Sequence, residues 1–327
     1  MDFRTTFKID PSPYRITYND PAMFVGSCFA SEIGGQFELG RMPVMINPSG
    51  AIYNPVSVYN SLDIIISNRK FAEKDLYYNN GIYFSFFHNT EFSSFDPEKV
   101  LGRINEGTKA AHDFLSSARF LFITFGTARV FRLNENRMIV SNCHKLPSDL
   151  FTRELLTVGE ITRIWSEMLQ QLCDLYPQLK IVFTISPVRH WKDGAHGNQV
   201  SKSVLFLAIE ELINHPVSPA YFPAYELLID DLRDYRYYGD DMLHPSSLAV
   251  DYIWEAFADS FIDGKAYEVR KEVARIVMAA EHRLLSDSPS GKEKFAGKML
   301  ESIEAISAKN PSIDLTKEKS HFLAMIK

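Results

Sequence analysis

The stretch Ala22–Phe37, AMFVGSCFASEIGGQF, predicts a strand, a tight turn and a helix. A short apolar run ends at Gly26, and apolar residues resume with helical spacing after Ser27. Ser27 is therefore expected where a strand ends and a helix begins, and unpaired N–H groups and the helix dipole favour developing negative charge there. Gly26 permits the sharp turn because it has no Cβ. A hydroxyl placed in this way can serve as a nucleophile, although serine is also a favoured helix N-cap.

The segment Asp240–Ser247, DDMLHPSS, lies just before a second apolar-periodic run, LAVDYIWEAFADSF. Asp241 and His244 are three residues apart, so the carboxylate can orient the imidazole and leave its other nitrogen free as a base. An isolated D-x-x-H also fits a capping aspartate beside a surface histidine. Its occurrence together with the Gly-Ser turn favours the catalytic interpretation. The Gly-x-Ser-x-Gly elbow of α/β-hydrolases is absent, because Phe29 and Ala30 follow Cys28.

At these residues the chain resembles a known family. Gly26-Ser27-Cys28-Phe29-Ala30 spells the motif for which the bacterial GSCFA family is named, and that family is similar to the SGNH (GDSL-like) hydrolases. The resemblance extends over residues 1–262 and includes Asn47-Pro48-Ser49-Gly50, Tyr53-Asn54-Pro55, Phe125-Gly126-Thr127-Ala128, Asn142-Cys143-His144-Lys145, Ser186–Trp191 and the Asp241–His244 pair. It implies a three-layer α/β/α fold with a mostly parallel, flavodoxin-like sheet. It also implies an SGNH-type esterase with a serine nucleophile.

In the mechanism that this resemblance implies, Ser27 attacks an acyl carbonyl, His244 takes its proton and Asp241 orients His244. The backbone N–H groups of Ser27 and Gly50 would stabilise the tetrahedral oxyanion. Water then completes ester hydrolysis, or a sugar hydroxyl does so in an O-acyltransferase. A rival mechanism uses Cys28 as the nucleophile, although small buried cysteines are often structural.

The chain departs from the wider superfamily at the end of the strand RFLFITF. The superfamily has Gly-x-Asn there and uses the asparagine as an oxyanion donor, whereas this chain has Gly126-Thr127-Ala128. Asn142 is the candidate replacement for the missing donor, with Thr127 as the alternative. Without a replacement, the loss corresponds to about 3–4 kcal/mol of transition-state stabilisation. A non-catalytic carbohydrate-binding module on the same fold is therefore an alternative function.

Thr127, Arg189 and His190 are the candidate substrate-binding residues, because they follow predicted strands whose loops converge on one crevice. Arg189 and His190 can bind a substrate carboxylate or hydroxyls, or instead pair with acidic neighbours. The polar side chains in these loops favour a small acyl group, such as acetyl on a carbohydrate, over a long acyl chain. Histidine spacings match no zinc pattern, and we predict neither a metal nor another cofactor.

Composition indicates one large α/β domain with an appendage, since the chain has 327 residues. The formal net charge is −6 with both signs interspersed, which predicts no nucleic-acid partner. The start has no apolar signal region, no run is long enough to span a membrane, and the three cysteines form no C-x-x-C pair. These features favour a cytoplasmic protein without a membrane partner. They leave the oligomeric state open.

The sequence also predicts the structure of two further segments, an aromatic hairpin and the C-terminal region. The aromatic hairpin around Asn80-Gly81 is expected to pack on the core rather than to form a sugar-binding face. Beyond Gly264 the pattern becomes that of charged surface helices, interrupted by a linker at residues 286–291. We therefore divide the chain into an SGNH-like domain, residues 1–264, and a helical extension, residues 265–327.

Overall fold

The structure is a computed structural model that describes residues 4–281 and 289–326. It contains two compact units. The first comprises Met1–Ile9 (described from Arg4 onward), Pro21–Gly34 and Met45–Ile253, and the second comprises Asp10–Asp20, Gly35–Val44 and Trp254–Lys327 (described to Ile326, without residues 282–288). The domain boundary expected at residue 264 stays a prediction.

The first unit is built on a five-stranded sheet in the order β10-β9-β5-β1-β2, and its pairings from β10 to β1 are parallel. The strands are β1 (Ala22–Gly26), β2 (Val44–Ile46), β5 (Phe120–Phe125), β9 (Lys180–Ile185) and β10 (Ala220–Phe222). Numbered along the chain within this sheet, the order is 2-1-3-4-5, that of flavodoxin-like folds. The structure confirms the expected fold class.

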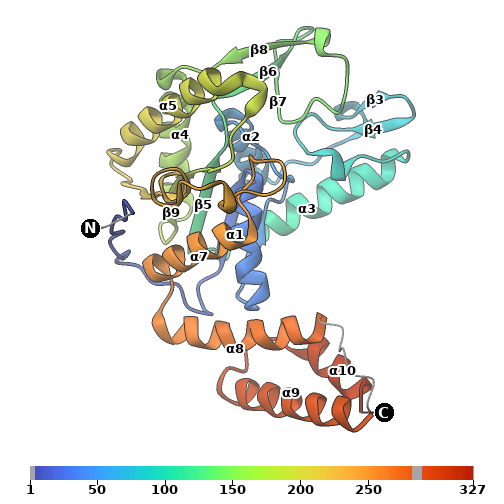
Figure 1. The fold of residues 1–327 in the computed structure, drawn as a ribbon. Coiled ribbons are helices and arrows are strands. Elements are labelled where there is room, and N and C mark those ends of the chain that lie inside the picture. Colours follow the sequence, from blue (N-terminus) through green and yellow to red (C-terminus); the bar gives the residue numbers. More distant parts are fainter. Residues whose placement is uncertain (1–3, 282–288, 327) are drawn as a thin grey trace. The chain divides into compact units, whose positions relative to one another are not determined.

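Helices cover both faces of this sheet (Figure 1). They are α1 (Cys28–Leu39), α2 (Pro55–Ile66), α3 (Pro97–Ser117), α4 (Val158–Leu175), α5 (Gly194–Ile213), the short α6 (Ala224–Glu226) and α7 (Ser247–Phe261). The direction of the strand order reverses after β2, so right-handed crossovers place α1 on one face and α2, α4 and α5 on the other. Both faces of the central strands are consequently buried, which explains their almost continuous apolar sequences.

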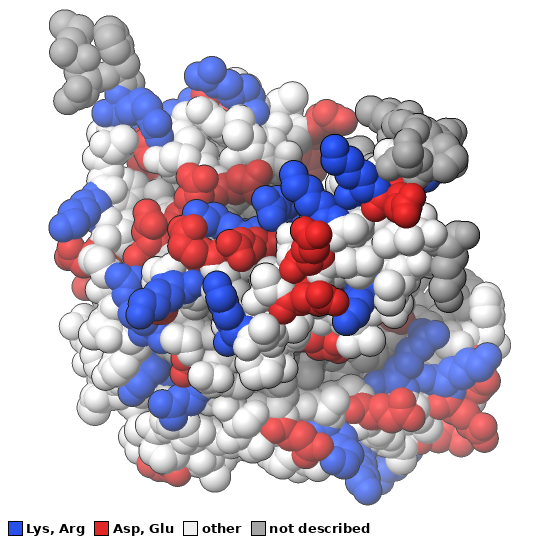
Figure 2. Space-filling view, turned by 90° about the horizontal axis from the view of Figure 1, so that it is seen from below, with Lys and Arg blue, Asp and Glu red and all other residues white. Residues whose placement is uncertain are grey.

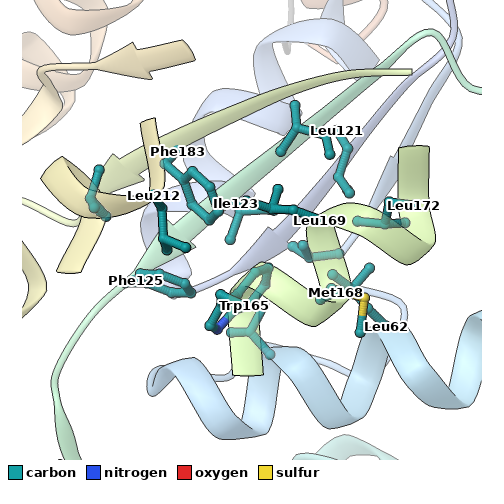
Figure 3. Packing of buried hydrophobic residues seen from close by; sticks show 14 of the residues in the cluster. Leu62, Leu121, Ile123, Phe125, Trp165, Met168, Leu169, Leu172, Phe183 and Leu212 are labelled. Carbon is teal, nitrogen blue, oxygen red and sulfur yellow. The ribbon is translucent and has the colours of Figure 1, made fainter. Parts of the chain in front are cut away.

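The main core lies between the sheet and α2, α4 and α5. Figure 3 shows Leu121, Ile123 and Phe125 of β5 and Phe183 of β9 facing the α4 side chains Trp165, Met168, Leu169 and Leu172. Trp165 is fully buried, and its indole N–H donates to the Pro55 carbonyl oxygen at 3.1 Å. Its one polar group is therefore satisfied inside the core.

Two small sheets stand beside the main one. A hairpin pairs β3 (Tyr77–Asn79) with β4 (Ile82–Phe84), and a three-stranded antiparallel sheet has the order β7 (Ile139–Val140), β6 (Arg129–Leu133) and β8 (Phe151–Leu155). Phe84 and Phe86 are buried in a cluster with residues of the three-stranded sheet. This cluster is separate from the main core, so the expectation that the hairpin's aromatic residues pack on the main core is wrong, although these two are buried.

The second unit contains the helices that follow α7: α8 (Gly264–Glu281), α9 (Pro289–Lys309) and α10 (Thr316–Ala324). They confirm the expected helical extension, and they enclose a cluster that includes Val273, Ile303 and Phe322. Residues 286–288 of the expected linker lie outside the described residues, and residues 289–291 begin α9. On the face shown in Figure 2, Lys and Arg side chains are interspersed with Asp and Glu side chains.

The first prediction concerns Gly26. Its φ is +131°, and a Cβ at this position would overlap the Thr124 carbonyl oxygen in the neighbouring strand β5. We expect Gly26→Ala to lower the free energy of unfolding by about 2 kcal/mol or more, since backbone strain and a clash with main chain combine. Urea denaturation provides the measurement.

The matched control is Gly102→Ala in α3, where a Cβ meets nothing within 4 Å. This change should stabilise the protein by roughly 0.5–1 kcal/mol, because alanine is the better residue inside a helix. Equal effects of the two changes would contradict the close contact at Gly26.

Candidate active site

The first unit has a pocket of about 700 Å³ at the carboxyl edge of its sheet. Ser27 follows β1, Thr127 follows β5 and Ser186 follows β9, and all three line it. The strand order of the sheet reverses between β1 and β5, which is the position where ligands bind in open α/β sheets. Residues of the three-stranded sheet and His244 complete the lining. The sequence-based expectation of a crevice at this edge is therefore met.

The turn between β1 and α1 is fixed by hydrogen bonds from a neighbouring loop. Asn47 has a left-handed backbone conformation, with φ 41°, and its side-chain oxygen accepts the Gly26 N–H at 2.8 Å. Its Nδ2 donates to Ser31 Oγ at 2.8 Å and to the Ser27 carbonyl oxygen at 3.3 Å. Asn47 thus holds the turn and the first helical turn together. Its place in the segment Asn47–Gly50 did not by itself indicate this role.

Ser27 lies at the floor of the pocket and is 1% exposed. Its Oγ is buried and has no hydrogen-bond partner among the described residues. An N-cap serine would accept a hydrogen bond from a backbone N–H of the first helical turn, and this hydroxyl accepts none. The capping role therefore does not account for Ser27. A buried hydroxyl without a partner is costly, which indicates a use other than stability.

Asp241 and His244 form a hydrogen-bonded pair in the loop before α7. His244 Nδ1 and Asp241 Oδ2 are 2.5 Å apart, and Asp241 Oδ1 accepts the backbone N–H groups of His244 and Leu243, each at 2.9 Å. The His244 N–H, the His244 side chain and the Leu243 N–H together lower the pKa of Asp241 to about 2. The carboxylate is therefore ionised at neutral pH, which assigns the proton to Nδ1 and leaves Nε2 as an acceptor.

Ser27 and His244 line the same pocket, whereas Asp241 lines the adjoining hollow. No hydrogen bond joins the Ser27 hydroxyl to His244 in this structure. Catalytic hydrogen bonds are often long in free enzymes and tighten when substrate binds. The structure thus brings the serine and the histidine to one pocket, with the aspartate behind the histidine.

The two backbone N–H groups expected to bind the oxyanion, those of Ser27 and Gly50, both have partners in this structure. The Ser27 N–H donates to the Thr124 carbonyl oxygen at 3.2 Å, and the Gly50 N–H donates to the Asn47 carbonyl oxygen at 2.7 Å. Gly50 lies outside the pocket lining, and a Cβ there would meet the Asn89 side chain. The close neighbour that requires glycine at this position is thus the Asn89 side chain and not a bound substrate. The role of Gly50 as a donor stays a prediction that requires release of its present bond.

Asn142 and Thr127 both line the pocket. Asn142 Oδ1 accepts the His144 N–H at 2.8 Å, which leaves its Nδ2 as the donor available to a ligand. The Thr127 hydroxyl lies 2.9 Å from Ser201 Oγ and accepts the Arg129 N–H at 3.1 Å. Because Thr127 has these partners, Asn142 is the better placed of the two to supply an additional donor.

Arg189 and His190 also line the pocket. The His190 imidazole packs edge-on against Tyr53, with ring centres 5.6 Å apart. Burial, together with the charges of Lys202 and Arg153, lowers the pKa of His190 to about 4. This imidazole is consequently neutral at pH 7 and can either donate or accept a hydrogen bond from substrate.

Two thiols, Cys28 and Cys143, line the pocket as well. Burial raises the pKa of the Cys28 thiol, and it raises that of Cys143 to about 11. A thiol nucleophile reacts as the thiolate, so these shifts disfavour both cysteines in that role. The rival mechanism based on Cys28 lacks an activated thiol.

Lys202 was not among the site residues expected from the sequence, and its side chain is buried. From α5, its Nζ donates to the carbonyl oxygens of Gly126 at 2.8 Å and Ser186 at 2.6 Å. These carbonyls directly follow β5 and β9, so one side chain ties together two edges of the pocket. Burial lowers the pKa of Lys202 to about 7, and the neutral amine still has the two N–H donors that these contacts need.

No group of three or more His, Cys, Asp and Glu side chains within residues 4–281 and 289–326 is arranged to hold a metal ion. In the same part of the chain, no helix combines the length and apolar character required to cross a membrane.

The doubly wound sheet and the pocket at its switch point define the class, a flavodoxin-like α/β protein with a serine at the floor of its ligand crevice. The model of the GSCFA family matches residues 21–257, and the chain belongs to this family. No curated protein matches it. A solved structure from Streptococcus pneumonia, described provisionally as a platelet activating factor, is similar over 73% of this chain and 83% of its own, with 14% identity and a TM-score of 0.39.

The second prediction concerns the pH dependence that Lys202 creates. Its pKa is about 7 in the folded chain and 10.5 when unperturbed, so between these values the unfolded chain binds the additional proton. The contribution of Lys202 to the free energy of unfolding therefore rises with pH across this window and is flat below it. We expect Lys202→Met to remove that rise, measured by urea denaturation at several pH values.

Lys109→Met, which removes an exposed lysine of α3, is the control for the loss of one positive charge. If the Lys202→Met and wild-type curves ran parallel from pH 7 to pH 10, the assigned burial of the charge would be wrong.

Proposed function

We propose that this protein is a serine-dependent acyl-ester hydrolase that acts on a small acyl ester, such as an acetyl ester of a carbohydrate. The observation that carries the proposal is the buried Ser27 hydroxyl, which has no partner in the described chain and shares its pocket with the Asp241-paired His244. The membership in the GSCFA family and its resemblance to SGNH hydrolases support the same chemistry.

The proposed reaction begins with binding of the ester against the pocket floor. His244 Nε2 removes the Ser27 proton as Oγ attacks the acyl carbonyl, and the ionised Asp241 stabilises the imidazolium that forms. The imidazolium then protonates the leaving alcohol, which departs and leaves an ester on Ser27. His244 then deprotonates a water molecule that attacks this ester, and as the bond to Ser27 Oγ breaks, His244 returns the proton to Oγ and the acid is released.

The developing oxyanion needs donors that strengthen in the transition state. Asn142 Nδ2 and the Ser27 N–H are the groups that we assign to it. The Ser27 N–H now donates to the Thr124 carbonyl oxygen at 3.2 Å, and its use by substrate requires release of that bond. The neutral His190 is a third donor at the pocket wall.

The residues that line the pocket also favour a substrate with hydroxyl groups over a substrate with a long acyl chain. Asn142 lines the pocket with its Nδ2 available as a donor, and a long acyl chain against it would leave this donor without a partner. Aromatic side chains, among them Tyr53, Phe131 and Trp191, offer faces for the apolar side of a sugar ring.

Two other functions fit the same fold. An O-acyltransferase would use the same acyl-enzyme and replace water with a sugar hydroxyl. A non-catalytic carbohydrate-binding module would use the pocket without the nucleophile, but it gives no reason for a buried serine without a partner or for the Asp241–His244 pair.

The third prediction tests the nucleophile. A fluorophosphonate should modify Ser27 alone, because this reagent needs a serine activated by a base, and peptide mapping by mass spectrometry locates the adduct. Ser27→Ala should abolish labelling while Cys28→Ala retains it. A folded protein that takes up no label, or takes it up elsewhere, would favour the binding module.

The fourth prediction separates the base from its orienting group. His244→Ala and Asp241→Asn should each lower kcat by about 10²-fold or more, since the first removes the base and the second allows the wrong tautomer. The double variant should be scarcely slower than either single variant, because the two residues act as one unit.

Asp240→Asn is the control, since Asp240 is exposed and adjacent to the pair. Additive losses in the double variant, or a large loss with Asp240→Asn, would show that the wrong residues have been assigned.

A further inference from the structure

The lining of the catalytic pocket carries an excess of positive charge. Five basic side chains take part in it: Arg129, Lys145, Arg153, Arg189 and Lys192. Among the described residues that line the pocket, none is an aspartate or a glutamate. This contrasts with the chain as a whole, in which acidic residues outnumber basic ones. The charge is therefore concentrated at the site rather than a reflection of composition.

A buried carboxylate behind the lining compensates only part of this charge. The Asp193 side chain is 2% exposed, and its Oδ1 contacts Arg153 at 2.6 Å and Arg129 Nε at 3.2 Å. Two guanidinium groups thus share one carboxylate. One carboxylate cannot neutralise two guanidinium groups, so the three side chains together keep a net positive charge, in a partly enclosed site where charges are weakly screened.

Arg189 has no such partner. It makes no ion pair or hydrogen bond with the described residues, and its Nε is buried without an acceptor. Its guanidinium carbon lies 5.5 Å from the centre of the Trp191 ring. Arg189 lines both the catalytic pocket and the adjoining hollow, which also contains Tyr235 and Tyr238. A planar guanidinium held against an aromatic ring, with unused donors, is well suited to a bidentate oxyanion.

We infer that the alcohol part of the substrate carries an oxyanion group, a carboxylate or a phosphate, and that Arg189 binds this group with the support of the Asp193-held arginines. This inference rests on the proposed function, because it takes the ligand to be an ester substrate. Binding of the anion itself does not require catalysis. Arg189 determines specificity: the anion fixes the ester against the pocket while the aromatic side chains contact its ring.

The first arm of the test measures binding and is independent of catalysis. Titration calorimetry of the wild-type protein with glucuronate, a hexose phosphate and glucose compares a carboxylate, a phosphate and a neutral sugar. At least one anionic sugar should bind about tenfold or more tightly than glucose, and added salt should weaken only the anionic ligand. Whether glucuronate or the hexose phosphate binds more tightly identifies the anion.

The second arm measures turnover of two acetyl esters that differ in charge, para-acetoxybenzoate and para-acetoxybenzamide. The wild-type kcat/KM should be about tenfold or more higher for the anionic ester, and Arg189→Gln should bring the ratio close to one. Arg163→Gln is the matched control, because Arg163 is an exposed arginine of α4 outside the pocket. It should leave the ratio at its wild-type value.

The outcomes separate the two proposals. Anionic sugars that bind no more tightly than glucose, or an ester ratio that Arg189→Gln leaves unchanged, would overturn the anion site and leave the hydrolase intact. A protein that hydrolyses neither ester but binds an anionic sugar tightly, and loses this binding with Arg189→Gln, would refute the hydrolase and retain the anion site.

Discussion

The close approach of Gly26 to the Thr124 carbonyl is the constraint on which the site depends. With φ +131°, Gly26 leaves no room for a Cβ beside the Thr124 carbonyl oxygen, and the chain turns from β1 into α1 at this point. The loop after β2 then fastens to the ends of both strands. Ile52 donates its N–H to the Gly26 carbonyl oxygen at 2.8 Å, and the Tyr53 carbonyl oxygen accepts the Gly126 N–H at 2.7 Å. The pocket floor is thus built from backbone bonds between strand ends, which positions Ser27 more rigidly than a free loop would.

The basic side chains around this pocket differ in how deeply they are buried. His244 is about half exposed and held by an ionised carboxylate, so it can carry a positive charge during the reaction. Lys202 is buried and His190 is partly buried, and both have lowered pKa values. The interior therefore gives up much of its positive charge, while the arginines at the pocket wall retain theirs. Under the proposed function, this arrangement places permanent positive charge at the pocket wall and the base His244 in the same pocket as Ser27.

The sequence predicted the features that depend on local patterns. The apolar runs ending at Gly26, Phe125 and Ile185 identified buried parallel strands, and the residues after them were correctly expected at a common edge. The contacts that depend on residues far apart in the chain were not predictable. Examples are the link from Asn47 to Gly26, the reach of Lys202 from α5 to two strand ends, and the sharing of Asp193 by two arginines. A spacing rule exists for helices and strands, but none exists for side chains that meet through tertiary packing.

The central claim is that Ser27 carries the acyl group during turnover, and trapping that intermediate tests it most directly. Rapid acid quench during turnover of para-nitrophenyl acetate, followed by digestion and mass spectrometry, should find an acetyl group on the Ser27 side chain, and His244→Ala should suppress its formation. Acetylation of Cys28 or another residue in its place, or undiminished hydrolysis by Ser27→Ala, would contradict the account.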